Sequence, residues 1–222
     1  MINPAKTMAS RPNPSPALNK TGARLVVGIS GASGVVYGIR LLELLKPTVI
    51  ETHLAISRSA EQALAYETDR KLKAVLALAD QVHPIDDLGA AISSGSFQTM
   101  GMIVAPCSVK TLAEIATGVT TTLISRAADV TLKERRRLVL MVRETPLHAG
   151  HLKNMLAATE IGAIIAPPVP AMYARPQSLE EMVDHSLGRV LDLFGIDTGR
   201  VMRWGQAARR RGPSDKGSPG RK

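Results

Sequence analysis

Apolar residues along the chain fall into short continuous runs, separated by stretches in which apolar positions recur every three or four residues. Continuous runs are typical of strands buried on both faces, and they occupy 25–30, 49–56, 101–106, 138–142 and 163–166. The stretches between them have helical periodicity. Strands that alternate with helices predict a parallel sheet covered by helices on both faces, which is the doubly wound α/β class.

The helical stretches can be placed by their periodicity and their first residues. Ser57, Ser108 and Ser178 each stand where a side chain can cap the helix that follows. A short strand at 82–85 and a loop at 92–100 complete the middle of the chain. We expect helices over 35–45, 57–67, 71–79, 108–118, 121–129, 148–160 and 178–194. The result is a mostly parallel, Rossmann- or flavodoxin-like three-layer sandwich, whose ligands bind beyond the carboxyl ends of the strands.

The turn after the first strand, residues 28–34, is rich in glycine. Glycines let a ligand approach the backbone, and the next helix offers free N–H groups and the positive end of its dipole. The turn therefore predicts an anion site, although glycines that serve only the chain reversal remain an alternative. It lacks the Gly-Lys-Ser/Thr of a P-loop and the glycine spacing of a dinucleotide fingerprint.

The turns after the next three strands also carry polar side chains. Ser57 and Arg58 follow the second strand, where a nicotinamide enzyme usually has an acid for the ribose, so this turn favours phosphate. Ser108 follows the third strand and is either a ligand or only a helix cap. Arg143 and Glu144 end the fourth strand at the same edge of the predicted sheet.

Cysteine and histidine offer little other chemistry. Cys107 is the only cysteine, which excludes an intrachain disulfide and a cysteine metal cluster. We expect it to be a small buried residue rather than a nucleophile. His148 and His151 lie three apart on a predicted helix without an evident third ligand. No metal site is therefore expected.

The net charge of +9 over 222 residues suggests nucleic acid at first, but its distribution argues against that. Residues 1–23 carry +3 and residues 205–222 carry +5, which leaves +1 for 24–204. We expect two disordered tails, the second of them basic, around one folded domain at 24–204. No apolar run reaches the ~18 residues that span a bilayer, and no signal peptide is evident. A cytoplasmic protein without a nucleic-acid or membrane partner is expected.

An ordered series of short motifs runs through most of this domain. It comprises 31–34 (GASG), 67–69 (ETD), 93–96 (SSGS), 106–108 (PCS), 126–130 (RAADV), 132–136 (LKERR), 143–146 (RETP), 171–173 (AMY), 175–178 (RPQS) and 203–204 (RW). In this series the chain resembles the UbiX-type flavin prenyltransferases, formerly labelled aromatic acid decarboxylases. The resemblance covers about residues 24–204.

The resemblance implies an activity and an assembly. A dimethylallyl group passes from dimethylallyl monophosphate to reduced FMN, with bonds at N5 and C6, and no metal takes part. The product, prenylated FMN, serves UbiD-type decarboxylases, often in ubiquinone synthesis. The family forms a homododecamer with sites between subunits. A pair of acids at 86–87 has no second acidic motif for Mg²⁺, which agrees with a monophosphate held by arginine and lysine.

The resemblance also implies roles for individual residues. Ser33 and Glu67 manage protons on the flavin, Glu144 belongs to the catalytic group, and Trp204 is a wall of the prenyl pocket. The residues implied for FMN are Gly31, Ala32, Ser33, Ser57, Ser108, Val109, Lys110, Thr111 and Arg143. Those implied for the prenyl phosphate are Arg126, Lys133, Glu144, Tyr173 and Arg189.

Two positions depart from the pattern, and other functions remain open. Arg137 stands where proline is expected, and Met172 stands where an aromatic residue is common. An FMN-dependent decarboxylase or oxidoreductase is one alternative, and an FMN-binding protein without transfer activity is another. Nucleic-acid binding through the tails is a third, and it would be sensitive to salt.

Overall fold

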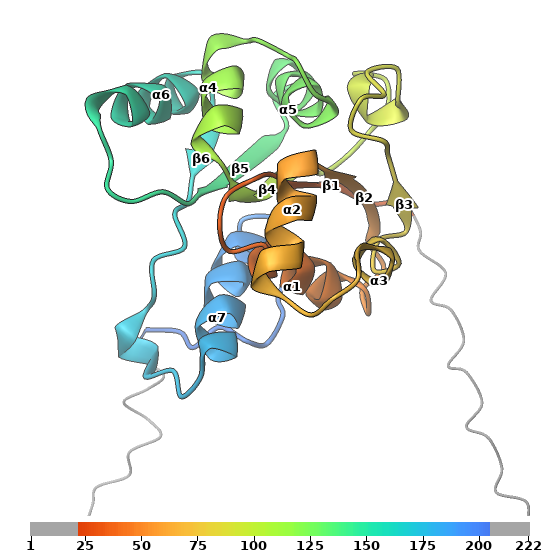
Figure 1. The fold of residues 1–222 in the computed structure, drawn as a ribbon. Coiled ribbons are helices and arrows are strands. Elements are labelled where there is room, and N and C mark those ends of the chain that lie inside the picture. The colour runs from red at the N-terminus through yellow and green to blue at the C-terminus, as the bar shows by residue number, and fades with distance from the viewer. Residues whose placement is uncertain (1–21, 205–222) are drawn as a thin grey trace, which may run out of the picture.

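The computed structural model describes residues 22–204, so most of the two predicted tails lies outside the described residues. Within this range a six-stranded sheet has the order β3-β2-β1-β4-β5-β6, and every pair of neighbours is parallel (Figure 1). The strands are β1 (Arg24–Ile29), β2 (Glu51–Ile56), β3 (Gln81–Val82), β4 (Gly101–Cys107), β5 (Arg137–Val142) and β6 (Ala163–Ile165). This is the strand order of a Rossmann fold, which confirms the predicted class.

Helices cover both faces of the sheet. The helices are α1 (Val36–Leu45), α2 (Arg58–Glu67), α3 (Leu72–Leu76), α4 (Val109–Thr117), α5 (Leu123–Lys133), α6 (Ala149–Glu160) and α7 (Leu179–Asp192). Two short 3₁₀ helices are η1 (Ala91–Ser93) and η2 (Met172–Ala174). In Figure 1, α4, α5 and α6 lie above the sheet, whereas α1, α3 and α7 lie below it. The three layers therefore follow from the alternation of strands and helices in the sequence.

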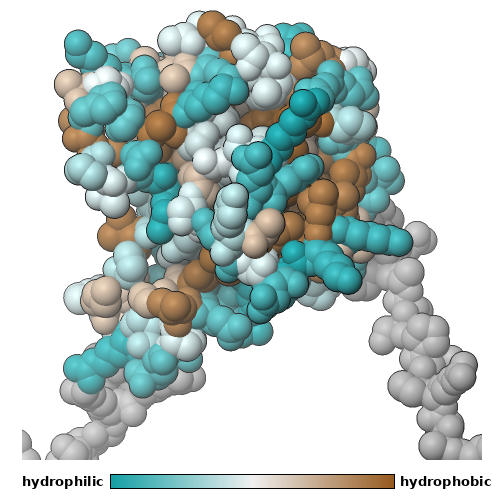
Figure 2. Space-filling view, viewed as in Figure 1, coloured by the Kyte–Doolittle hydropathy of each residue, from teal (hydrophilic) through white to brown (hydrophobic). Residues whose placement is uncertain are grey.

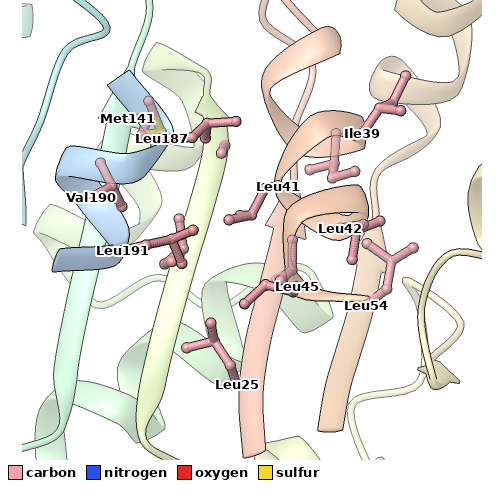
Figure 3. Packing of buried hydrophobic residues seen from close by; sticks show 14 of the residues in the cluster. Leu25, Ile39, Leu41, Leu42, Leu45, Leu54, Met141, Leu187, Val190 and Leu191 are labelled. Atoms are coloured by element: carbon pink, nitrogen blue, oxygen red, sulfur yellow. The ribbon is translucent and has the colours of Figure 1, made fainter. Parts of the chain in front are cut away.

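Successive residues of each strand point to opposite faces and build two separate cores. On one face, Leu25, Val27 and Ile29 pack against α1, α2, α3 and α7. Figure 3 shows Leu41 of α1 and Leu187 of α7 on the same side of the sheet. On the other face, the strands pack against α4, α5 and α6. A sheet buried on both sides explains why its strands are apolar without alternation.

Several predicted boundaries differ from the structure. The helix expected at 121–129 is α5, which continues to Lys133. The strand expected at 82–85 is only the two-residue β3, and both of its side chains are exposed. The loop expected at 92–100 begins within η1. Short or polar segments of this kind take their structure from neighbouring elements, so their own periodicity is a weak guide.

A long connection between β6 and α7, residues 166–178, extends away from the sheet and is called the arm below (Figure 1). It includes η2, and its Val169 and Met172 side chains are exposed. Figure 2 shows hydrophobic side chains among hydrophilic ones on the surface of the molecule. Among residues 22–204, no helix has the length and apolar character needed to cross a membrane.

Candidate active site

A cavity of about 410 Å³ lies at the carboxyl ends of β1, β2, β4 and β5, where the turns of these strands meet. Its lining residues are Gly31, Ala32, Ser33, Ser57, Ser59, Ser108, Val109, Lys110, Thr111, Glu114, Thr122, Ile124, Arg143 and Glu144. All nine residues that the resemblance implies for FMN are among them. We call this the flavin cavity. It occupies the edge at which ligands bind in open parallel sheets.

Two serines start the helices that border the flavin cavity. The Ser57 hydroxyl accepts a hydrogen bond from the Ala60 N–H at 3.1 Å, and the Ser108 hydroxyl accepts one from the Thr111 N–H at 3.2 Å. Both serines therefore cap their helices. For Ser108 this is the helix-cap role that the sequence offered beside a role in ligand binding. Because the same side chains line the cavity, the positive ends of α2 and α4 face the space where an anion would bind.

The glycine turn lies close against its neighbours. A Cβ on Gly31 would lie 2.3 Å from the Ser59 Cβ, and a Cβ on Gly34 would lie 2.9 Å from the Arg143 Cδ. Gly34 also has a φ of +95°, which side-chain-bearing residues rarely adopt. Glycine at these two positions therefore brings the turns after β1, β2 and β5 together around the cavity.

Ser30 joins the turn after β1 to the turn after β4, a link that has no signal in the periodicity of the sequence. Its hydroxyl donates to the Pro106 carbonyl at 3.0 Å and accepts from the Ser108 N–H at 2.8 Å. The side chain is 1% exposed. Because the buried hydroxyl both donates and accepts a hydrogen bond, it fixes the distance between the two turns.

Glu67 ends α2 and reaches the start of α1. Its carboxylate accepts hydrogen bonds from the Gly34 N–H at 2.8 Å and the Val35 N–H at 2.9 Å. Val35, at the start of α1, has no side-chain cap of its own. The expectation that the first N–H groups of this helix are free to bind an anion is therefore wrong for these two, because the protein's own carboxylate occupies them.

A second cavity of about 580 Å³ adjoins the first and shares Ser33, Arg143 and Glu144 with it. Most of its other walls are apolar. Its lining residues are Ser33, Gly34, Val36, Tyr37, Glu67, Val142, Arg143, Glu144, Thr145, Pro167, Pro168, Val169, Pro170, Leu179, Met182 and Val183. Burial raises the pKa of the half-buried Tyr37, and the nearby Arg143 charge opposes the shift in part. The Tyr37 hydroxyl is therefore neutral at physiological pH.

The two cavities bring together three of the four residues proposed as catalytic. Ser33 and Glu144 line both, and Glu67 lines the second. Trp204 lines neither, and its side chain is 82% exposed. The donor residue Glu144 is thus at the cavities, whereas the other four donor residues are elsewhere in the described chain.

Arg126 and Lys133 lie on α5 and are engaged with acids on the same helix or directly after it. Arg126 pairs with Asp129 at 2.8 Å, and Lys133 pairs with Glu134 at 2.5 Å. Neither lines the two cavities. Both are accessible to solvent, so these ion pairs are weak and can be exchanged for another anion.

Tyr173 on the arm, Arg189 on α7 and Trp204 beyond α7 are linked through their neighbours. The Tyr173 and Trp204 rings pack edge to face with their centres 5.2 Å apart. Arg189 pairs with Asp192 at 2.9 Å, and Arg203 donates to the same carboxylate. These residues also lie outside the lining of the two cavities.

Cys107 and the two histidines at the start of α6 do not line either of the two cavities. Cys107 is fully buried, and burial raises the pKa of its thiol far above the usual value. His148 caps α6 by accepting from the Gly150 N–H, and its ring stacks on His151. Within residues 22–204 no group of three or more potential ligands could hold a metal.

Several lining residues were missed by sequence reasoning. In the flavin cavity these are Ser59, Glu114, Thr122 and Ile124. In the second cavity, residues 167–170 follow β6 and so lie at the same edge as the other turns. The rule that ligands bind after parallel strands identifies this last segment too, because the apolar run at 163–166 directly precedes it.

Comparison with known proteins agrees with this geometry. The Flavoprotein family model matches residues 14–191. The flavin prenyltransferase UbiX of Neisseria meningitidis serogroup B is 57% identical over 82% of this chain and 96% of its own length. The enzyme of the same name from Escherichia coli K12 is 60% identical over 78% of this chain and 92% of its own.

Solved structures extend the likeness. AnUbiX (PadA1), crystallised with FMN and dimethylallyl pyrophosphate, has a TM-score of 0.81 and 55% identity over 82% of this chain and 97% of its own. A dodecameric FMN-dependent UbiX-like decarboxylase from Escherichia coli O157:H7 has a TM-score of 0.80 and 47% identity over 82% and 98% of the two chains.

The doubly wound fold, the cavity beyond its strands and the family match define a flavoprotein. Within that class, the high identity over nearly the whole length of the relatives is decisive. The chain belongs to the UbiX flavin prenyltransferase family.

Proposed function

We propose that this protein transfers a dimethylallyl group from dimethylallyl monophosphate to reduced FMN and joins it to N5 and C6. The product would be prenylated FMN for a UbiD-type decarboxylase. The observation that carries the proposal is the flavin cavity, which is lined by all nine residues that the family pattern implies for FMN. These nine residues come from four separate turns of the sequence.

The residues of the flavin cavity fit FMN. A volume of about 410 Å³ is in the usual range for a ligand of this size. Two helix starts with Ser57, Ser108 and Thr111 suit a terminal phosphate, and Lys110 and Arg143 supply positive charge. The absence of a side chain at Gly31 lets Ser59 lie directly against the turn that lines the cavity.

The adjoining cavity suits a five-carbon chain. Its apolar lining from α1, α7 and residues 167–170 would exclude water from an allylic group, and Arg143 at its border favours negative charge. Reduced FMN supplies the nucleophilic atoms when it is bound. The donor's carbon–oxygen bond to phosphate would break as the carbon–nitrogen bond forms and N5 loses its proton. Ring closure would then consume the prenyl double bond, which takes up one proton as its other carbon joins C6 and the C6 proton is released.

The protein's own groups then have distinct tasks. Ser33 and Glu67 lie where they could carry the proton from the flavin, and Glu144 borders both cavities. A leaving phosphate needs cations, which Arg126, Lys133 and Arg189 would supply. The π face of Trp204 would stabilise developing allylic charge.

We infer that the donor site is completed between subunits of a homododecamer. The cations and Trp204 lie outside both cavities of one chain, so a neighbouring copy must present them if they are to act. The relative from Escherichia coli O157:H7 is dodecameric, which supports this assembly. The cytoplasmic location, the recipient decarboxylase and the lack of nucleic-acid, membrane and metal partners stay predictions.

The decisive experiment is anaerobic incubation of the purified protein with reduced FMN and dimethylallyl monophosphate, followed by mass spectrometry of the released flavin. We expect one dimethylallyl group per flavin, with or without EDTA. The pyrophosphate is tested in parallel, because the AnUbiX structure contains that donor. FMN recovered without added mass would overturn the proposal and favour a flavin-binding protein or an FMN-dependent decarboxylase.

A further inference from the structure

One face of α7 carries Asp184, Gly188 and Asp192, which are spaced four residues apart and so lie in a row. A Cβ on Gly188 would lie 2.4 Å from the Val201 Cγ2 and 3.1 Å from the Thr198 Oγ1. Glycine in a helix is normally unfavourable by about 0.5–1 kcal/mol. Here it allows the segment 198–204, called the C-terminal strap below, to lie directly against the helix.

The two aspartates of this row hold the strap at two points. Asp184 accepts from the Arg40 Nε at 2.6 Å and pairs with Arg200 of the strap at 3.4 Å. Asp192 accepts from Arg203 of the strap through both of its oxygens, with Nη2 to Oδ1 at 2.8 Å. A carboxylate that receives both guanidinium N–H groups has the strong, well-oriented form of an ion pair.

Asp192 also binds Arg189, so its carboxylate lies between two guanidinium groups. The Arg189 Nη1 lies 2.9 Å from Oδ2, and the Asp192 side chain is only 17% exposed. The pKa of Asp192 is held below its ordinary value, chiefly by the hydrogen bonds from Arg203. The positive charge of Arg189 lowers this pKa further. The carboxylate is therefore ionised at neutral pH and keeps two like charges close together.

The same contacts place an aromatic pair. Trp204 directly follows Arg203, and its ring packs edge to face on Tyr173. The Tyr173 hydroxyl lies 3.4 Å from the Nε2 of the buried His185, which is also 3.4 Å from the Met202 carbonyl oxygen. Residues assigned to the donor on the arm, on α7 and on the strap are thus joined in one network that passes through Asp192.

We propose that Asp192 is a positioning residue for the prenyl donor. It holds Arg189 and Arg203 side by side for the donor's phosphate, and through Arg203 it fixes Trp204 against Tyr173. The inference rests on the proposed function and adds two residues to it, Asp192 and Arg203. A guanidinium has five N–H donors, so each arginine keeps free donors for a phosphate after pairing with the aspartate.

The competing explanation is that Asp192 only stabilises the fold, or even competes with the phosphate for Arg189. These ideas give opposite results in the variant Asp192→Asn, which keeps the shape of the side chain and removes its charge. A purely structural role lowers stability without changing the KM for the donor. Competition lowers this KM, because the freed arginine binds phosphate more tightly.

The matched control is Asp197→Asn. Asp197 directly precedes the strap, and its Oδ1 lies 4.0 Å from the Arg203 Nη2. Unlike that of Asp192, its side chain is 74% exposed. The full-length oligomer is assayed with reduced FMN and dimethylallyl monophosphate. We expect Asp192→Asn to raise the donor KM about tenfold or more, which is the usual effect of losing charge-assisted hydrogen bonds. FMN affinity should stay within about twofold, and Asp197→Asn should behave as wild type in both assays.

Trp204 provides a readout that does not depend on activity, because it is the only tryptophan of the chain. Its fluorescence anisotropy in the flavin-free full-length protein should fall in Asp192→Asn and in Arg203→Gln, and Asp192→Glu should restore part of it. The variant Arg203→Gln, which changes a partly exposed side chain, should also raise the donor KM, so it tests the inference if Asp192→Asn does not fold.

An unchanged or lowered donor KM in a folded Asp192→Asn protein would overturn the inference, as would unchanged Trp204 anisotropy in both variants. Failure of the wild-type protein to prenylate FMN would instead count against the proposed function. In that case the anisotropy comparison still decides whether Asp192 fixes the strap.

Discussion

The flavin cavity and the residues assigned to the prenyl donor differ in where their side chains come from. Those of the cavity follow β1, β2, β4 and β5, and hydrogen bonds of Ser30 and Glu67 tie the turns together. The donor residues other than Glu144 lie on α5, α7 and the arm, where Arg126, Lys133 and Arg189 are paired with nearby acids.

On the proposed assignment of residues, flavin binding is a property of one subunit, whereas donor binding depends on the assembly. Turns at the edge of a parallel sheet are fixed by the strands, so their side chains converge in any single chain that folds. In the proposed assembly, the exposed arginines on α5 and α7 bind the same phosphate only when a neighbouring subunit packs against them. Variants in the two regions should therefore separate FMN binding from donor use.

The largest effect should come from Glu67→Gln. Both N–H groups of the α1 start bind one oxygen of Glu67, so the amide oxygen of glutamine can keep the cap while losing the ability to carry a proton. We expect turnover to fall by about 10²–10⁴, with FMN and donor still bound. Rapid-quench mass spectrometry of the flavin should show that ring closure is the impaired step.

Glu61→Gln on the same helix is the control and should be fully active. Normal turnover in Glu67→Gln together with an unchanged melting temperature would mean that Glu67 serves only as a helix cap. Such a result would remove the proton carrier from the flavin half of the site.

Arg189→Ala should affect the donor half alone. Loss of a charge-assisted contact to phosphate typically costs about 1.5–3 kcal/mol, or roughly ten- to a hundredfold in kcat/KM for the donor. The FMN dissociation constant should barely change, because Arg189 does not line the flavin cavity. Arg70→Ala, a similarly exposed arginine paired with Glu43, is the control. Weaker FMN binding with unchanged donor use would reverse the assignment of the two halves.

Gly31→Ala should affect the flavin half alone. The new Cβ would lie 2.3 Å from the Ser59 Cβ, so the turn must move. Overpacking of this kind costs about 1–3 kcal/mol, and we expect FMN affinity by calorimetry to fall roughly ten- to a hundredfold. Ser59→Gly in the same chain should restore part of it. Gly89→Ala, where the nearest neighbour would be 3.4 Å away, should bind FMN normally.

The sequence predicted the fold and the meeting of the turns after the strands for the same physical reason. Buried strands such as 101–106 have an unmistakable apolar pattern, and the topology then assigns every following turn to one edge. Ser57, Ser108 and Arg143 were found in this way. Side-chain links across turns, such as that of Ser30, depend on register and have no signal in periodicity.

The donor half could not be derived in this way. Residues such as Arg126 and Tyr173 were assigned by resemblance to a family, and their roles stay predictions. The strap on α7 was not expected either, because its determinant is the absence of a side chain at Gly188 together with acids four residues away on each side. That pattern is visible only once residues 198–204 are known to return along the helix.

The smallest expected effect concerns the pH dependence of stability, and it should leave both halves of the site unchanged. His53 on β2 is 4% exposed, and its Nδ1 lies 2.9 Å from the Nε2 of His83. Burial lowers the pKa of both imidazoles, and neither residue lines the two cavities. In the unfolded chain both would take up protons below a pH of about 6.5. The unfolded state thus binds more protons in this range, so the free energy of unfolding falls as the pH drops below about 6.5.

In His53→Asn the difference between the melting temperatures at about pH 7.5 and 5.5 should be smaller than in the wild type. FMN affinity and donor KM at the higher pH should stay the same. An equal or larger difference would show that this pair does not contribute, and a change in either binding constant would show that the β2–β3 edge is coupled to the site.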